Sequence, residues 1–157
     1  MKADLNRVIL ESGHGDSFSI SGAQFSIKVN STETGASFGV ITCSAPPKYP
    51  GFPEHIHKQT IEVVYVLEGQ LTVLLAGATK QVGPGNLVFI PAEVVHAFSN
   101  PHQIPAKFLL ISAPGGLEQY LRELATAMDN HGHPLPKAVM ANLASVYDWE
   151  ILASPIE

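Results

Sequence analysis

Cysteine and charge are both scarce in this 157-residue chain, and each scarcity excludes a class of protein. The single cysteine, Cys43, excludes an internal disulfide, and its apolar neighbours predict a buried thiol. Charged residues make up only 15% of the chain, against 45% hydrophobic residues, which indicates a globular protein rather than a disordered one. The length suits one domain, so we expect residues 1–157 to fold as a single unit.

Positive charge is scarcer still, because nine lysines and arginines stand against fourteen acidic residues. No basic run occurs, so we expect no nucleic-acid partner. No apolar run reaches the length of a membrane span, and the stretch MKADLNRVILES lacks the apolar centre of a signal peptide. We therefore expect a cytoplasmic protein with no membrane partner.

Short β-type runs separated by glycine and proline fill the first two thirds of the chain. Many short strands at this spacing predict an antiparallel sandwich or barrel. Runs such as VFI and FLLI are apolar on both faces, which predicts strands buried between two sheets. The predicted strands cover residues 18–20, 24–30, 37–44, 61–67, 70–76, 86–90, 94–99 and 106–112, with turns at 32–35, 46–53, 68–69, 77–80, 83–85 and 100–105.

After the segment PGG at 114–116, the spacing of apolar residues changes from that of a strand to that of a helix. A second helix is expected over residues 136–148. We expect one or two helices to pack outside the barrel, with the barrel over roughly 15–113 and a helical extension over 114–150. The apolar face of the first helix consists of Leu117, Tyr120, Leu121, Leu124 and Met128.

Two histidines and a glutamate precede and open an apolar strand in the segment PEHIHKQTIEVVYVLEG, residues 53–69. Residues two apart in a strand point the same way, so His55 and His57 present both imidazoles to one side. The polar residues that follow allow a turn, which brings Glu62 alongside, and His96 on a later strand offers a third imidazole. Because burying these groups unpaired is costly, the set predicts a site for a divalent transition metal.

The spacing of these residues resembles the two motifs of the cupin superfamily, and specifically its small single-domain members akin to quercetin dioxygenases. The first motif reads H-x-H, three or four residues, E, six residues, G, and the matching residues are His55, His57, Glu62 and Gly69. The second reads G, five residues, P-x-G-x-x-H, three residues, N, and the matching residues are Gly85, Pro91, His96 and Asn100. The resemblance covers roughly residues 36–112, and PGGLEQYLRELA is similar to the helix that follows the barrel in this group.

The resemblance implies an all-β fold, an antiparallel jelly-roll barrel or sandwich with one or two C-terminal helices outside it. It also implies one divalent transition metal (Fe, Mn, Ni, Co, Cu or Zn), bound by His55, His57, Glu62 and His96. Exposed strand edges and the habit of the family favour a homodimer. One position departs from the second motif, because Glu93 stands where glycine tolerates a positive φ, so we expect a strained or altered turn there.

The function we favour is a dioxygenase-type reaction on a small apolar, enolisable or phenolic substrate, with Glu62 as the base. Two alternatives stay open: a small-molecule-binding cupin that needs metal but does not turn over, and an isomerase of a sugar or enolisable acid. The isomerase is disfavoured because the only arginines, Arg7 and Arg122, lie outside the barrel. The predicted pocket lining, chosen by strand position, is Phe38, Phe52, Val64, Val66, Phe89, Phe98 and Phe108.

Overall fold

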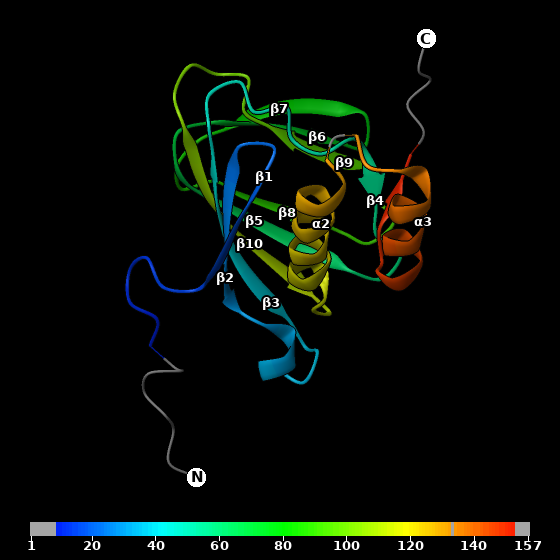
Figure 1. The fold of residues 1–157 in the computed structure, drawn as a ribbon. Coiled ribbons are helices and arrows are strands. Elements are labelled where there is room, and N and C mark those ends of the chain that lie inside the picture. The colour runs from blue at the N-terminus through cyan, green and yellow to red at the C-terminus, as the bar shows by residue number, and fades with distance from the viewer. Residues whose placement is uncertain (1–8, 133, 153–157) are drawn as a thin grey trace.

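The computed structural model describes residues 9–132 and 134–152, and within them the strands form two facing antiparallel sheets (Figure 1). One sheet has six strands in the order β1-β2-β3-β10-β5-β8, and the other has five in the order β11-β4-β9-β6-β7. The predicted antiparallel sandwich is thus confirmed. The strands are β1 (Asp16–Ile20), β2 (Ala23–Val29), β3 (Gly39–Ala45), β4 (His55–Ile56), β5 (Ile61–Glu68), β6 (Leu71–Leu75), β7 (Ala78–Val82), β8 (Leu87–Ile90), β9 (His96–Ser99), β10 (Ala106–Ala113) and β11 (Glu150–Ile151).

Alternating burial along the strands builds the core between the two sheets. In β5 every second side chain is buried, including Val64 and Val66, which have no exposed surface. Cys43 on β3 is buried as predicted, and burial raises the pKa of its thiol. Phe18 and Phe25 stack across β1 and β2 with ring centroids 5.7 Å apart, at the end of the sheet farthest from β8.

The outer face of β5 and β8 in the six-stranded sheet is largely exposed, so the prediction of burial on both strand faces is wrong for these strands. In β8 the inward residues Val88 and Ile90 are buried, whereas Leu87 and Phe89 are 59% and 52% exposed. The run VFI is apolar throughout, but apolarity alone does not reveal which face meets a second layer.

Two short strands, β7 and β11, were not predicted because they contain few apolar residues, and β4 was expected only through the strand geometry assumed for His55 and His57. β7 was expected to be part of a turn over 77–80, but the turn is made by Ala76 and Gly77, both at positive φ. Leu75 and Ala78 pair directly across it, so β6 and β7 form a tight hairpin. The other missed strand, β11, is only two residues long.

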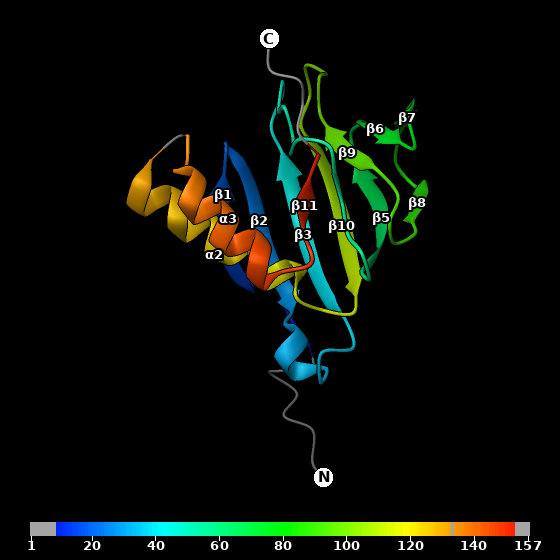
Figure 2. The same ribbon diagram turned by 90° about the vertical axis from the view of Figure 1, so that its right-hand side faces the viewer.

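Helices α2 (Leu117–His131) and α3 (Lys137–Val146) lie outside the two sheets, on the side of β1 and β2 (Figure 2). The predicted apolar face of α2 packs inward: Tyr120 and Leu121 are at most 2% exposed. A short 3-10 helix, η1 (Ser31–Glu33), precedes β3. No helix within residues 9–132 and 134–152 combines the length and the apolar character needed to cross a membrane.

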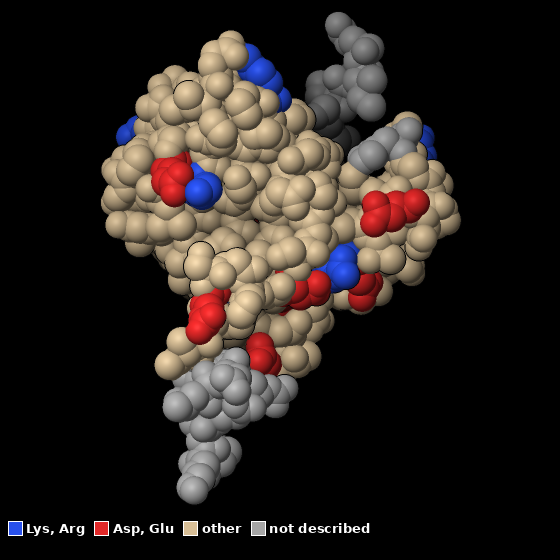
Figure 3. All heavy atoms as spheres, turned by 60° about the vertical axis from the view of Figure 1, so that its left-hand side comes forward, with Lys and Arg blue, Asp and Glu red and all other residues tan. Residues whose placement is uncertain are grey.

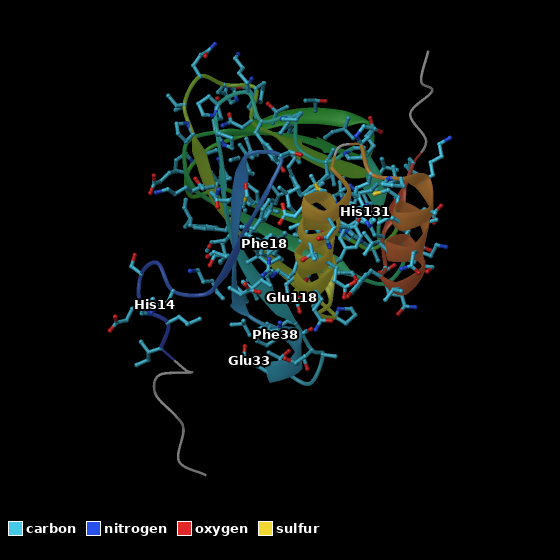
Figure 4. The ribbon with its side chains drawn as sticks, in the orientation of Figure 1. His14, Phe18, Glu33, Phe38, Glu118 and His131 are labelled. Carbon is cyan, nitrogen blue, oxygen red and sulfur yellow. The ribbon has the colours of Figure 1, made fainter. Side chains whose placement is uncertain are left out.

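The first turn of α2 is tied to the 3-10 helix η1 by a buried carboxylate, Glu118, which also lies against Gly39 of β3 (Figure 4). Its oxygens accept hydrogen bonds from the backbone N–H of Ser31 at 2.8 Å and of Gly116 at 3.0 Å. A Cβ on Gly39 would lie 2.2 Å from Glu118 Oε2, so glycine alone leaves room for this contact. The inner end of α2 is therefore fixed where it borders the cavity described below.

Candidate metal centre

The three histidines and the glutamate of the sequence motifs meet between the two sheets. His55 lies on β4 and pairs with His96 on β9, whereas Glu62 comes from β5 of the opposite sheet. His57 follows directly after β4. Each residue offers a ligand atom within 4.8 Å of the others, and none is more than 2% exposed.

Backbone carbonyls fix the orientation of all three imidazoles. His55 Nδ1 lies 2.8 Å from Pro53 O, and His96 Nδ1 lies 2.8 Å from Val94 O. His57 Nδ1 bonds to the carbonyl of Asp148. Because a carbonyl oxygen only accepts, each Nδ1 carries the proton, and in the neutral ring Nε2 is left with a free lone pair.

Charge in the cluster is arranged to keep Glu62 ionised. Burial alone would raise the pKa of Glu62, but the nearby imidazoles of His57 and His96 lower it to about 2. Burial and the neighbouring His96 lower the pKa of His55 to about 3, so that ring is neutral near pH 7. Burial also lowers the pKa of His57, but the nearby Glu62 carboxylate outweighs burial, so the pKa of His57 is raised.

The cluster fits a divalent cation because it leaves buried ligand atoms without partners. His57 Nε2 lies 2.6 Å and His96 Nε2 lies 3.6 Å from Glu62 Oε1. Neither ring nitrogen has a hydrogen-bond partner of acceptable geometry. Imidazole nitrogens and a carboxylate oxygen are ligands that divalent transition metals accept, so a cation there would satisfy all of them. The cluster could therefore bind a metal ion, whose identity the ligand types leave open.

The cluster borders a cavity with apolar walls and a volume of about 30 Å³, space for one or two water molecules. Three of the predicted lining residues, Phe52, Phe98 and Phe108, do line it. The complete lining is Phe25, Tyr49, Phe52, His55, Glu62, Phe98, Phe108, Leu110, Leu117, Leu121 and Trp149.

The other four predicted lining residues do not border this cavity. Phe89 is 52% exposed on the outer face of β8, and Phe38 is 40% exposed just before β3 (Figure 4). The prediction is wrong for these two because strand alternation turns them away from the core. Val64 and Val66 share the inward face of β5 with Glu62, but they are packed into the core away from the cavity lining.

The C-terminal segment was not predicted to take part, yet it closes the site. The Trp149 indole stacks on His55 with ring centroids 3.8 Å apart and an 8° angle between the planes. β11 pairs with β4, which carries His55. The segment was interpreted only as the end of a helix. Its one available signal was the single tryptophan of the chain, in a short polar stretch.

Both motifs contain residues that shape the backbone rather than the site. Gly69 has φ +71, and a Cβ there would lie 2.2 Å from Pro105 O. Glu93 has φ +64, so the turn expected of the missing glycine is kept, and Glu93 N donates to His57 O at 2.7 Å. The Asn100 amide donates to three carbonyls, among them Ile104 O at 2.9 Å.

The remaining described histidines lie away from the cluster. His14 is exposed in the segment before β1, and His131 is exposed at the end of α2 (Figure 4). His102 is half-buried in the loop before β10. A second H-x-H pair runs from His131 to His133, but His133 lies outside the described residues.

Comparisons with known proteins agree with this geometry. A family model described as a cupin domain matches residues 42–112. A quercetin 2,3-dioxygenase of Bacillus subtilis (strain 168) is 29% identical over 126 residues, which is 80% of this chain but only 37% of that protein. The chain thus spans little more than a third of the length of this relative.

Solved structures show the same fold. A predicted oxalate decarboxylase from Thermotoga maritima has a TM-score of 0.63 at 16% identity, over 67% of this chain and 97% of the other. An RmlC-like cupin from Shewanella frigidimarina has a TM-score of 0.60 at 19% identity, over 70% and 93%. The match over residues 42–112, the jelly-roll sandwich and the four-residue cluster make this chain similar to small cupins, among them quercetin dioxygenase-like proteins.

Proposed function

We propose that this protein is a metal-dependent oxygenase of small apolar, enolisable or phenolic molecules. The metal would be held by His55, His57, Glu62 and His96. The observation that carries the proposal is a buried carboxylate among three oriented imidazoles, at the edge of a cavity with apolar walls. The distant likeness to a quercetin 2,3-dioxygenase supports it.

A bound divalent cation would supply Lewis acidity and a fixed position for a substrate oxygen. The chain supplies the rest. The apolar side chains, among them Phe52 and Phe108, exclude water and favour an uncharged ring system. Glu62 is the one carboxylate of the cavity lining and stays ionised near pH 7, so we assign it the acceptance of a proton from a substrate hydroxyl, whose acidity a bound cation would have to increase because Glu62 is a weak base.

Oxygen uptake tests this proposal. The metal-free protein is loaded anaerobically with Fe(II), Mn(II), Co(II), Ni(II), Cu(II) or Zn(II), one at a time, and mixed with oxygen and a panel of flavonols and diketones. We expect uptake with at least one redox-active metal, its loss in Glu62→Gln, and normal uptake in the exposed control Glu93→Gln. Absence of uptake with every metal would reject the oxygenase, and normal turnover by Glu62→Gln would reject the base.

A non-catalytic, metal-dependent binding protein is the second candidate, and in either case the cavity must widen to admit an aromatic ligand. A volume of about 30 Å³ has no room for a flavonol as the chain stands. Binding without turnover would raise the melting temperature while no product appears. The isomerase ranks third, because the cavity lining contains no lysine or arginine to hold a phosphate or carboxylate.

We further propose that two copies of the chain associate through the outer face of the six-stranded sheet. Apolar side chains on this face form rows across the strands, because the register aligns them. One row is Val40, Ile111, Val63 and Phe89, and the next is Leu109, Tyr65 and Leu87. The strongly exposed apolar side chains of β5 and β8 are Ile61, Tyr65, Leu67, Leu87 and Phe89, 37–59% exposed, and they would form the centre of an interface.

We also retain the predictions of a single domain, a cytoplasmic location and no nucleic-acid partner. One apolar core joins both sheets to α2 and α3, which supports a single domain. On the face shown in Figure 3, lysines and arginines are scattered rather than gathered into a basic patch.

A further inference from the structure

Residues 147–152, which we call the C-terminal strap, lie across the candidate metal centre. The strap is held at both ends by backbone contacts. β11 pairs with β4, and Leu152 N donates to Glu54 O at 3.0 Å. At the other end the Asp148 carboxylate accepts hydrogen bonds from three successive backbone N–H groups, those of Lys58, Gln59 and Thr60, at 2.7, 2.9 and 2.8 Å.

Between these ends the strap inserts Trp149 into a slot with two ring-shaped walls. One wall is the His55 imidazole, 3.8 Å from the indole at 8°, and the other is the Tyr120 ring, 4.6 Å away at 19°. The rings of Phe52 and His57 meet the indole edge-on at 5.6 and 5.0 Å. The slot is therefore a site for a flat aromatic ring, occupied by one from the chain itself.

Trp149 also separates the inner cavity from the outside. It is 6% exposed, and it lines the inner cavity of about 30 Å³. It lines two outer hollows as well, of about 540 and 140 Å³, on the side of α3 and Tyr147. Free volume thus lies next to the strap on its outer side, where the indole can move if the two-residue pairing of β11 with β4 opens.

The strand pairing that holds the strap in place is short. β11 pairs over only two residues, and the Lys58–Glu150 ion pair is solvent-exposed, so it contributes little. Trp149 Nε1 is buried without a hydrogen-bond partner, which costs free energy that an open strap would recover. The strap contacts the rest of the chain chiefly through Asp148, Trp149 and the two residues of β11, and a short segment of this kind opens locally at a fraction of the global free energy of unfolding.

We propose that the slot between His55 and Tyr120 is the binding subsite for a planar, uncharged aromatic ligand, and that the strap must swing outward to admit it. Trp149 occupies the subsite until a ligand displaces it. That the ligand is the substrate of the metal centre rests on the proposed function; the slot and the displacement do not. Planarity follows from the two nearly parallel walls, and lack of charge follows from the inner cavity behind the slot, which has no lysine or arginine; Lys58 and Glu150 line only the hollow on the outer side.

The test uses the fact that Trp149 is the single tryptophan of the chain. 5-Fluorotryptophan incorporated there gives one ¹⁹F resonance from the buried indole. In metal-free protein without oxygen, 2-naphthol should shift this resonance toward its position in the urea-unfolded chain, whereas cyclohexanol, which is not planar, should not. Naphthol binding is followed separately by its own fluorescence. A resonance that stays unchanged at saturating 2-naphthol, or no binding of 2-naphthol, overturns the proposal.

Two variants measure the competition between Trp149 and the ligand. If the indole occupies the subsite, Trp149→Ala should bind 2-naphthol at least tenfold more tightly than the parent chain, since displacement no longer opposes binding. Trp149→Leu, which preserves an apolar side chain if the alanine variant does not fold, should bind it more tightly as well. Equal or weaker binding in the folded variants would show that Trp149 helps to hold the ligand, against the proposal.

These results separate the inference from the proposed function. A shifted ¹⁹F resonance without oxygen uptake keeps the subsite and rejects the oxygenase. Oxygen uptake with an unmoved resonance keeps the oxygenase and rejects the strap movement.

Discussion

Replacement of Asp148 by alanine should release the C-terminal strap while the rest of the sandwich stays folded. The Asp148 carboxylate accepts three backbone hydrogen bonds, from Lys58, Gln59 and Thr60. Partial burial opposes ionisation of Asp148, but these N–H groups hold its pKa below the usual value. Hydrogen bonds to a charged group contribute about 1.5–3 kcal/mol each when buried.

The expected loss is smaller than the sum of three such bonds. Asp148 is half-buried, and in the alanine variant water would replace part of the hydrogen bonding that the carboxylate provides. We therefore expect the strap to lose about 2 kcal/mol of docking free energy, which would raise the open fraction roughly thirtyfold. Because the Asp148 carbonyl also orients His57 and moves away with an open strap, metal affinity should fall in proportion to the fraction of molecules whose strap is open.

Two measurements check this. Acrylamide quenching of the single Trp149 reports the open strap, and a competition titration with a chromophoric chelator reports metal affinity. The matched control is Asp129→Ala, which removes an exposed carboxylate from α2. If the Trp149 fluorescence of Asp148→Ala is quenched no more than that of Asp129→Ala, and both variants bind metal equally well, then Asp148 does not hold the strap closed.

Four further predictions follow from the same contacts. His57→Ala should purify with much less metal by elemental analysis, whereas His131→Ala should not. In metal-free protein the pKa of His55 is about 3 but near 6.5 in the unfolded chain, so the unfolded state binds more protons. The free energy of unfolding in urea should then fall by up to about 1.4 kcal/mol per pH unit from pH 6.5 to 5, and less steeply in His55→Gln. Glu93→Gly should stabilise the chain by up to about 1 kcal/mol in urea unfolding, since glycine relieves φ +64; no gain would mean an unstrained turn. Leu87→Glu should lower the mass measured by light scattering from a dimer to a monomer, and an unchanged mass would exclude this face.

The spacing of residues in the sequence was sufficient to predict that the four residues of the cluster lie together. H-x-H places both imidazoles on one side of a strand, and the motif distances carry Glu62 and His96 to it from other strands. The strand alternation that predicted this also fixed the inward face of β5. These features are local or repeat with a fixed period, so one chain reveals them.

The cavity was predicted less well because its walls come from contacts distant in sequence. Phe89 lies in a run that is apolar on both faces, and no local signal tells which face a second sheet covers. Trp149 reaches His55 from 94 positions away, through a two-residue strand with no sequence pattern of its own. Leu121 was recognised as part of an apolar helix face, but the helix period alone does not say that it borders a cavity.

Because the cluster takes its residues from both sheets, a bound ion would affect how long the protein survives in a cell. The imidazoles lie on or beside one sheet and the Glu62 carboxylate lies on the other, so an ion bound by all four would cross-link the two sheets of the sandwich. Molecules that never bind the ion would then open locally more often, and proteases would cleave them sooner. The steady-state abundance of this chain would thereby follow the supply of metal, with no dedicated sensor involved.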